Sequence, residues 1–398
     1  MGDSNGSGPV TVLRIIARLN VGGPAIQAID LTRRLEPLGY TTVLLTGELS
    51  PGEASMQHVA RRLDVEPVQV AGLKRSLGFH DVKALWGAIR WVRRVKPQVV
   101  HSHTAKAGAI ARLAARLTPG HRPAVVIHTF HGHVFEGEFS PRVSRVFARV
   151  ERALAKRATR IIAVSTEIRQ DLIDLGVAPP EKIEVVHLGF DLAPFCVEGE
   201  ERKRARDRLR EDLGIPLDAS VVTVVARVTK VKRIDRFLEM ATLLPDDVWF
   251  VVAGDGNYRA ELERSTASRR LGDRIVWAGF QQEMPPMCFA SDVVVLTSDN
   301  EGTPVCLIEA QAAGVPVVTT AVGGVETVVG DGVTGFVVDA DARALANRVE
   351  SLLRDPELRA RLGEAGRERS LANFGVERLV ADIDGLYRRL LDESRLVS

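Results

Sequence analysis

Residues 292–320 read DVVVLTSDNEGTPVCLIEAQAAGVPVVTT, and they join two short valine-rich runs through a loop and a helical segment. The runs Asp292–Leu296 and Pro316–Thr319 have the composition of buried strands. A helix that starts around Pro304 or Val305 would return the chain so that the two strands run parallel. This pattern predicts an α/β protein whose parallel sheet is covered by helices.

The same rhythm continues on both sides of this stretch. Helical segments such as Ala25–Leu38 and Asp81–Lys96 separate several further apolar runs. The rhythm weakens over a charged stretch at 196–213 and then restarts. The expected strands are Val12–Ala17, Thr42–Thr46, Val99–His101, Ala124–Thr129, Arg160–Val164, Glu184–Leu188, Ser220–Ala226, Val248–Ala253, Arg274–Trp277 and Gly335–Val338. We therefore predict two Rossmann-like, doubly wound domains facing a central cleft.

The expected boundaries follow from this restart. Residues 1–10 are rich in Gly, Ser and Asp and are predicted to be disordered. The first Rossmann-like domain is expected at 11–193 and the second at 194–375. A terminal helix at 376–398 is expected to pack back on the first domain.

The composition excludes several classes of protein. The chain has 398 residues, of which 45% are hydrophobic and 26% charged, as in ordinary globular proteins. Its three cysteines are far apart and form no CxxC pair, so neither a disulfide framework nor a zinc site is indicated. The start resembles no signal peptide, and no apolar run could span a membrane. We expect a cytoplasmic protein.

The loop after Asp292–Leu296 carries two acids, Glu301 and Glu309. Thr303 is expected to cap the following helix, and Pro304 fits its first turn. The free amides of this helix start, near Val305, suit a phosphate. Each carboxylate could accept hydrogen bonds from vicinal sugar hydroxyls. A loop acid and a surface helix acid are the alternative interpretation.

Two cations follow the strand Ser220–Ala226. Arg227 and Lys232 lie five residues apart in a strand-to-helix loop and could clamp a diphosphate from two sides. A solvated basic loop is the alternative. Lys230 is an additional cation, so the sequence leaves open which lysine reaches a phosphate.

A glycine turn, Gly22-Gly23-Pro24, lies between the first strand and the next helix. Glycine allows the backbone to approach an anion closely, and Pro24 fits a helix start. A plain tight turn is the alternative. The turn lacks the GxGxxG pattern, which disfavours an NAD enzyme.

Histidines gather near the ends of two expected strands. Five of the nine are His101, His103, His128, His131 and His133. A zinc site is not favoured, because no Cys or acid accompanies them at ligand spacing. For most of them, a core or surface role is the simplest interpretation.

The spacing Glu301-x7-Glu309, followed by Ala312–Val318 and by Gly323-Gly324, resembles the E-x7-E motif of retaining GT-B glycosyltransferases of the family-4 type. The resemblance runs from about Val12 to Leu390. It implies transfer of a sugar from a nucleotide-sugar, with 11–193 as the acceptor domain and 194–375 as the donor domain. It also implies no cofactor and no obligatory metal, because cations and amides neutralise the diphosphate.

The resemblance implies a role for each matching residue. Glu301 would contact the donor sugar and Glu309 the ribose hydroxyls. His131 would donate a hydrogen bond near the anomeric carbon, with His128 and His133 as alternatives. The remaining donor-binding candidates are Gly23, Arg227, Lys232, Phe280, Gln281, Thr303, Pro304 and Val305.

The partners are a nucleotide-sugar, with uridine favoured over guanosine, and a carbohydrate or lipid-linked acceptor. Residues 74–122 carry eleven basic side chains and one acid, Asp81, with Trp86 and Trp91 among them. This surface predicts docking on an anionic membrane, whereas a solvated amphipathic helix is the alternative. No nucleic-acid module is present. A nucleotide-sugar epimerase and a non-catalytic nucleotide-sugar-binding protein are the competing functions.

Overall fold

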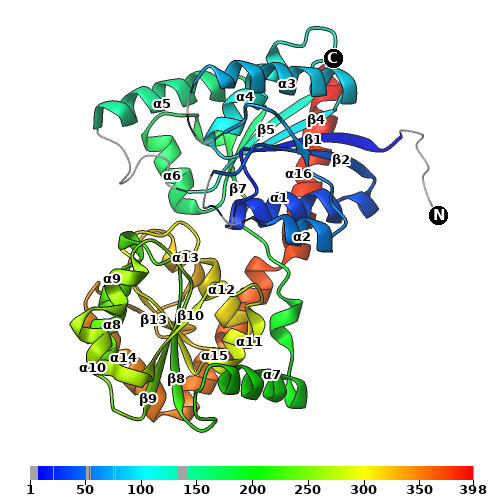
Figure 1. Cartoon of the computed structure of the whole chain (residues 1–398). Coiled ribbons are helices and arrows are strands. Elements are labelled where there is room, and N and C mark those ends of the chain that lie inside the picture. Colours follow the sequence, from blue (N-terminus) through cyan, green and yellow to red (C-terminus); the bar gives the residue numbers. More distant parts are fainter. Residues whose placement is uncertain are drawn as a thin grey trace, which may run out of the picture. The chain divides into compact units, whose positions relative to one another are not determined.

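The computed structural model describes residues 8–20, 22–50, 53, 55–74, 76, 78–132 and 141–397. The chain forms two compact units (Figure 1). The N-terminal unit combines Met1–Phe190 with Val376–Ser398, and the C-terminal unit is Asp191–Gly375. The boundary falls slightly before the predicted one. Val10 already lies in a strand, so the predicted disordered segment 1–10 is too long, and residues 1–7 lie outside the described part.

The N-terminal unit contains a seven-stranded parallel sheet in the order β3-β2-β1-β4-β5-β6-β7. The strands are β1 (Val10–Ile16), β2 (Tyr40–Thr46), β3 (Val68–Gln69), β4 (Val99–His103), β5 (Val125–Phe130), β6 (Arg160–Ala163) and β7 (Ile183–Val185). The order reverses between β1 and β4, which is the switch point of a doubly wound sheet.

Helices cover both faces of this sheet (Figure 1). Val12 of β1 packs against α1 and α16, whereas the next residue, Leu13, packs against α3 and α4. This alternation is the period-2 pattern of a strand buried on both sides. The helices are α1 (Gly23–Arg34), α2 (Gln57–Arg62), α3 (His80–Val95), α4 (Ala105–Arg116), α5 (Pro141–Ala155), α6 (Thr166–Asp174) and α16 (Val376–Val397).

The C-terminal unit contains a six-stranded parallel sheet in the order β10-β9-β8-β11-β12-β13. Its switch point lies between β8 and β11. The strands are β8 (Ser220–Val225), β9 (Val248–Ala253), β10 (Ile275–Gly279), β11 (Val293–Leu296), β12 (Val317–Thr320) and β13 (Gly335–Val338). One face packs on α8 and α14, and the other on α7 and α11.

The helices of this unit are α7 (Gly199–Asp212), α8 (Ile234–Ala241), α9 (Arg259–Glu263), α10 (Thr266–Leu271), α11 (Pro285–Ala290), α12 (Val305–Ala312), α13 (Val325–Val328), α14 (Ala342–Arg354) and α15 (Pro356–Phe374). Short 3-10 helices at Glu36–Leu38, Pro180–Lys182, Ala193–Cys196, Lys230–Lys232 and Gly272–Arg274 complete the described elements.

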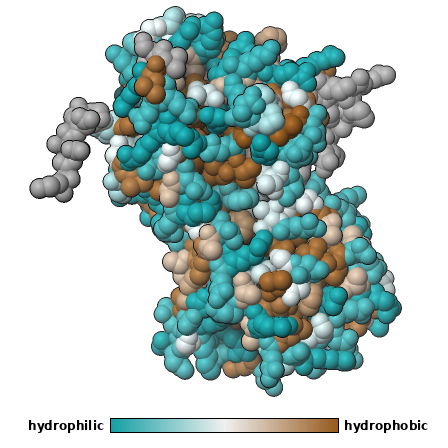
Figure 2. Space-filling view, turned by 180° about the vertical axis from the view of Figure 1, so that it is seen from behind, coloured by the Kyte–Doolittle hydropathy of each residue, from teal (hydrophilic) through white to brown (hydrophobic). Residues whose placement is uncertain are grey.

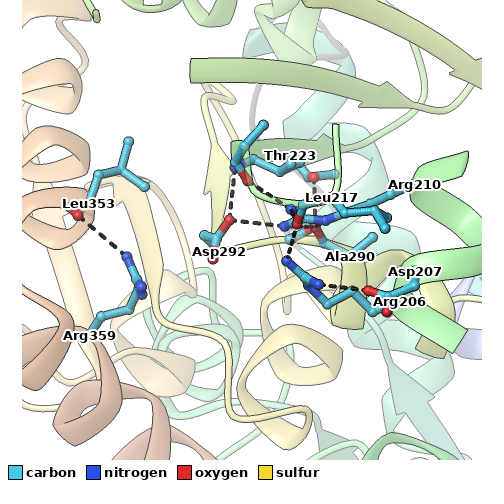
Figure 3. Close-up of polar contacts among 12 residues, drawn as sticks. Arg206, Asp207, Arg210, Leu217, Thr223, Ala290, Asp292, Leu353 and Arg359 are labelled. Carbon is cyan, nitrogen blue, oxygen red and sulfur yellow. Dashed lines mark hydrogen bonds and ion pairs between the residues drawn. The ribbon is translucent and has the colours of Figure 1, made fainter. Parts of the chain in front are cut away.

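The charged stretch after residue 196 is helix α7 rather than a linker. Arg210 of α7 is fully buried and donates to the carbonyl oxygens of Ala290 and Ala219 at 2.7 Å each. It also donates to Asp292 Oδ2 at 3.1 Å (Figure 3). One arginine thus ties α7 to the residues that precede β8 and β11, which explains why a strongly charged segment belongs to the C-terminal unit.

Candidate functional site

In the C-terminal unit, the loops after β8 and β11 meet at the switch point. The Asp299 amide donates to Val231 O at 2.9 Å, and Thr297 Oγ1 donates to Lys232 O at 3.0 Å. Arg236, which is nearly buried on α8, donates to Thr297 O at 2.6 Å. These bonds bring the predicted cation loop and the predicted acid loop together.

Glu301 is nearly buried, with 9% of its surface exposed. Its Oε1 accepts from Lys232 Nζ at 2.5 Å and from Ser298 Oγ at 2.6 Å. Within the described residues, Oε2 has no hydrogen-bond partner. The ion pair with Lys232 holds the carboxylate in place and leaves Oε2 available for a ligand.

A glycine pair holds the backbone beneath Glu301. Gly323 has a φ of +49°, and a Cβ atom there would lie 1.9 Å from Glu301 O. A Cβ atom at Gly324 would lie 2.0 Å from Gly302 O, and the Gly324 amide donates to Glu301 O at 3.0 Å. The sequence indicates a role for these glycines only through the family resemblance. Their packing role depends on a contact that sequence spacing does not reveal.

The start of α12 differs from the prediction. Pro304 immediately precedes the helix, which begins at Val305, and no side chain caps it. The prediction that Thr303 caps the helix is therefore wrong. Thr303 Oγ1 is instead buried and lacks a partner among the described residues. The amides of Val305 and Cys306 precede the first hydrogen-bonded amide, that of Leu307, so this helix start offers donors to an anion.

Glu309 lies on α12, half-buried, and its carboxyl group has no hydrogen bond or ion pair within the described residues. Burial raises its pKa to about 8. Burial likewise raises the pKa of the neighbouring Cys306 thiol to about 12. A carboxyl group in an apolar setting without a partner is ready to bind hydroxyl groups.

Arg227 is exposed, and no described side chain pairs with it. Its loop packs against the turn at Gly254 and Gly256, where Cβ atoms would lie 1.9 Å from Ala226 O and 2.3 Å from Val228 O. The Gly-Asp-Gly sequence therefore supports the cation loop. Lys230, the extra cation, points its Nζ over the Tyr258 ring at 5.8 Å from its centre.

The turn after β10 presents Phe280, which is 50% exposed. The side-chain amide of Gln281 donates to Ala278 O at 2.7 Å and stabilises the turn. In the N-terminal unit, Gly23 is buried as the first residue of α1, after Gly22 with a φ of +154°. Both turns lie after strands, where the sequence placed them.

The histidines of the N-terminal unit form one buried cluster. His101, His103 and His128 are fully buried, and His131 is half-buried. His103 Nδ1 lies 3.0 Å from His131 Nε2. Burial lowers the pKa of His131 to about 3 and holds the pKa values of the other three well below the usual value.

The three candidates for the predicted histidine role differ in access. His128 lies under Gly108 of α4, where a Cβ atom would approach its ring to 2.3 Å. His131 keeps a buried Nδ1 without a partner in the described part of the chain. His133 lies outside the described residues. The geometry favours His131 over His128.

Among the described residues, no group of three or more His, Cys, Asp and Glu side chains is arranged to hold a metal ion. None of their helices combines the length and the apolar character needed to cross a membrane. The acids of Asp382-Ile383-Asp384 pair with Arg378 and Arg388 on α16.

Two doubly wound units, with an acid, cations and a helix start gathered at one switch point, define a glycosyltransferase of the GT-B class. The Glycosyltransferase Family 4 model matches residues 21–194, and the model Glycosyl transferases group 1 matches residues 205–369. The chain belongs to this group 1 and family 4 type of glycosyltransferase, which use nucleotide-sugar donors.

Several proteins are similar to the chain. A UDP-Gal:alpha-D-GlcNAc-diphosphoundecaprenol alpha-1,3-galactosyltransferase of Escherichia coli is 30% identical, over 77% of this chain and 79% of that protein. A D-inositol 3-phosphate glycosyltransferase of Salinispora tropica is 33% identical, over 88% and 71%.

Solved structures share the fold. Sucrose-phosphate synthase from Thermosynechococcus elongatus has a TM-score of 0.80 at 22% identity, covering 96% of this chain and 100% of that one. HepE of Anabaena, in complex with UDP-glucose, has a TM-score of 0.78 at 21% identity, covering 95% and 99%. The predicted GT-B fold is confirmed.

Proposed function

We propose that the chain is a retaining glycosyltransferase that moves a hexosyl or N-acetylhexosaminyl group from a UDP-sugar to a lipid-linked glycan precursor, without an obligatory metal. The observation that carries this proposal is the Glu301 carboxylate, fixed by Lys232 with one oxygen free, beside the start of α12. The relatives support its details, because the Escherichia coli enzyme is named for UDP-Gal and a diphosphoundecaprenol acceptor.

The diphosphate would be neutralised by side chains and amides. Arg227 and Lys232 supply positive charge, and the amides of Val305 and Cys306 supply hydrogen bonds at the positive end of α12. The unpartnered hydroxyl of Thr303 can donate to a phosphate oxygen. These donors do the work that a divalent cation does at other sites, which is why no obligatory metal is proposed.

The sugar and the nucleoside would be held by the two acids. Glu301 would accept hydrogen bonds from sugar hydroxyls, and Glu309 from the ribose hydroxyls. The described residues offer no separate carboxylate assigned as a nucleophile, so we favour front-face attack over a double displacement. The bond from the anomeric carbon to the phosphate oxygen breaks, and the acceptor hydroxyl bonds to the same face. Its proton passes to the departing phosphate.

The donor assignment is tested by thermal shift with UDP-, GDP- and ADP-sugars, because a bound donor stabilises the fold according to its affinity. We expect UDP-sugars to give the largest shift. A larger shift with GDP- or ADP-sugars would contradict the choice of base. Transfer is then assayed with GlcNAc-diphosphoundecaprenol and with D-inositol 3-phosphate as acceptors, and the anomeric configuration of the product is read by NMR.

Retention predicts an α-linked product from an α-linked donor, and an inverted product would contradict it. Activity should survive EDTA, and a loss restored by a divalent cation would contradict metal independence. Glu301→Gln should abolish transfer in a folded protein, while Glu357→Gln, at an exposed acid of α15, should leave it unchanged. Donor conversion without any acceptor would favour an epimerase instead.

We also propose that α3 docks the N-terminal unit on an anionic membrane. Phe79, Val82 and Trp86 are 99%, 56% and 60% exposed at helical spacing, and the basic side chains Lys83 and Arg90 are exposed on the same helix. Trp91 does not contribute to this surface, because it is partly buried and the Arg94 Cζ atom covers its ring at 4.9 Å from the ring centre. Apolar patches interrupt the hydrophilic surface of both units in Figure 2.

Vesicle co-sedimentation tests the docking surface. Phosphatidylglycerol vesicles should bind the protein at low salt, and phosphatidylcholine vesicles should not. The double variant Phe79→Ser, Trp86→Ser should weaken binding about tenfold or more, because it removes two apolar side chains that would be buried in the membrane interface. Val333→Ser, at a 61% exposed position of the C-terminal unit, is the matched control. Salt-independent binding, or equal losses in both variants, would contradict docking through α3.

A further inference from the structure

Arg14 on β1 is fully buried, and its guanidinium pairs with no carboxylate in the described part of the chain. Its hydrogen-bond partners are His101, His103 and Tyr387. A buried guanidinium without an acid is costly unless its donors are used, and Arg14 Nε has no partner among the described residues, so the bonds from the two Nη atoms are essential to the arrangement.

A guanidinium can only donate hydrogen bonds, and this fixes the proton of His103. Arg14 Nη1 lies 3.3 Å from His103 Nε2, so that nitrogen must accept. His103 is neutral, because burial holds its pKa well below the usual value. A neutral imidazole whose Nε2 accepts carries its proton on Nδ1.

The same reasoning fixes the proton of His131. His103 Nδ1–H faces His131 Nε2 at 3.0 Å and donates to it. His131 is also neutral, since burial lowers its pKa to about 3. Its proton therefore lies on Nδ1, which is buried and has no partner among the described residues. The series of hydrogen bonds that starts at Arg14 and passes through His103 therefore ends at an unused donor, the Nδ1–H of His131.

We infer that Arg14 is a positioning residue that acts through His103 to hold His131 as the Nδ1–H tautomer, so that His131 donates a hydrogen bond to the sugar and cannot accept a proton from it. The role toward the sugar rests on the proposed function. The tautomer itself is a property of the unliganded protein and can be tested without any substrate.

A second branch from Arg14 ends elsewhere and supplies the control. Tyr387 of α16 lies 3.4 Å from Arg14 Nη2 and 2.6 Å from His101 Nδ1. His101 Nε2 lies 2.7 Å from Thr129 Oγ1, where the branch stops. Tyr387 therefore accepts from Arg14 and donates to His101, and this branch does not reach His131.

The test is long-range 15N NMR of the histidine rings in the full chain, which distinguishes the two neutral tautomers. In the parent protein, His131 should show a protonated Nδ1 and an unprotonated Nε2. In Arg14→Met the constraint on His103 is lost, and His131 should become a mixture of tautomers. Arg14→Lys keeps a donor and should restore the parent pattern, as should Tyr387→Phe, in which the branch to His103 is intact.

Kinetics give the second readout. Arg14→Met should lower kcat about tenfold with little change in the donor KM, because only part of the His131 population keeps the donor in place. A protonated Nε2 on His131 in the parent would overturn the inference, as would an unchanged tautomer in folded Arg14→Met. The parent spectrum decides even where Arg14→Met fails to fold. Correct tautomers without any sugar transfer would instead contradict the proposed function alone.

Discussion

The two units share one architecture and differ in how they treat the polar groups at their switch points. Near the ends of β1, β4 and β5, Arg14 and the buried histidines are mostly hydrogen-bonded to one another or to their neighbours, and the ring and guanidinium atoms left without a partner in the described residues are Arg14 Nε, His128 Nε2 and His131 Nδ1. At the ends of β8 and β11, Arg227 and the Glu309 carboxyl group have no partner within the described residues. Most polar groups of the N-terminal network are paired with one another, whereas Arg227 and Glu309 of the C-terminal network are unpaired in the described residues.

The difference shows what each network is built to do. A hydrogen-bonded network in a low-dielectric interior is rigid, and this one presents a defined donor at His131 Nδ1. A set of unpaired polar and charged groups is destabilising by itself and becomes satisfied when a ligand supplies the missing charges and hydroxyls. A charged ligand should therefore stabilise the C-terminal unit more than the N-terminal unit. The contribution of the N-terminal unit is a hydrogen-bond donor that is already in position before the ligand binds.

The largest expected effect concerns the ion pair between Lys232 and Glu301. Lys232→Met leaves Glu301 with only the Ser298 hydroxyl and removes a cation from the diphosphate site. We expect kcat to fall about 10²- to 10³-fold, as for other lost electrostatic contacts in active sites. Lys230→Met, at an exposed lysine over Tyr258, is the matched control and should cost less than about threefold.

Steady-state transfer assays at saturating donor measure both variants, with circular dichroism to show that each is folded. The sequence could not decide between Lys230 and Lys232, because both lie at reasonable spacing from Arg227. Equal losses in the two variants would show that the loop acts as a diffuse charge rather than through one lysine.

The second prediction concerns acid pH. Burial keeps His101, His103, His128 and His131 neutral in the folded protein, with pKa values depressed below the unfolded value. The unfolded chain binds more protons below pH 6.5, so stability is present near pH 7 and is lost as pH falls. Each such histidine should lower the free energy of unfolding by about 2 kcal/mol as the pH falls from 6.5 to 5.

Hydrogen-exchange mass spectrometry of β4 and β5 peptides measures this loss without interference from the C-terminal unit. His128→Asn should flatten the pH dependence by about one proton, whereas His121→Asn, at an exposed position, should leave it unchanged. Equal stability at pH 7 and pH 5 would show that the histidines can be protonated without unfolding.

Sequence periodicity predicted most of the fold, because buried parallel strands are short, valine-rich and separated by amphipathic helices. Val248–Ala253 and Gly335–Val338 match β9 and β13 residue for residue. The two-residue β3 (Val68–Gln69) was missed, since it is too short to show a pattern. The stretch 196–213 was not recognised as a helix, because its charge hides the buried contacts of Arg210.

The site was predictable only in part, for a related reason. Acids, cations and glycines after strands are visible in a sequence, and these residues do gather at one switch point. Hydrogen bonds between distant residues are not visible. Arg14 and Tyr387 are 373 positions apart, so neither the closed histidine network nor the orphaned hydroxyl of Thr303 could be foreseen.

The third prediction tests the backbone support of Glu301. Gly323→Ala places a methyl group 1.9 Å from Glu301 O at a positive φ, so the loop must move. We expect a loss of about 1–3 kcal/mol in stability. Gly332→Ala, with a φ of +69° and open space around it, is the matched control for the cost of the backbone angle alone.

Urea unfolding gives the two free energies, and donor titration reports the loop. Gly323→Ala should weaken donor binding as well as stability, whereas Gly332→Ala should lower stability only. Full donor affinity in Gly323→Ala would mean that the Glu301 loop adjusts without losing its function.

The smallest expected effect concerns the open acid. Burial raises the pKa of Glu309 to about 8, above its unfolded value near 4.5, so the folded protein holds this proton more tightly. Stability linked to this group is therefore complete below pH 4.5 and declines as pH rises toward and through 8. Glu309→Gln removes the charge and should raise the Tm by about 2–4 °C at pH 9, for about 1 kcal/mol left after solvent screening. At pH 5 the gain should vanish, because the parent carboxyl group is then already neutral.

Calorimetry with and without a UDP-sugar separates the two roles of Glu309, since the variant should be more stable when empty and should gain less on binding the donor. If Glu309→Gln were no more stable than the parent at pH 9, the carboxyl group would have a partner in solution. The C-terminal unit would then not differ from the N-terminal unit in leaving this acid unpaired.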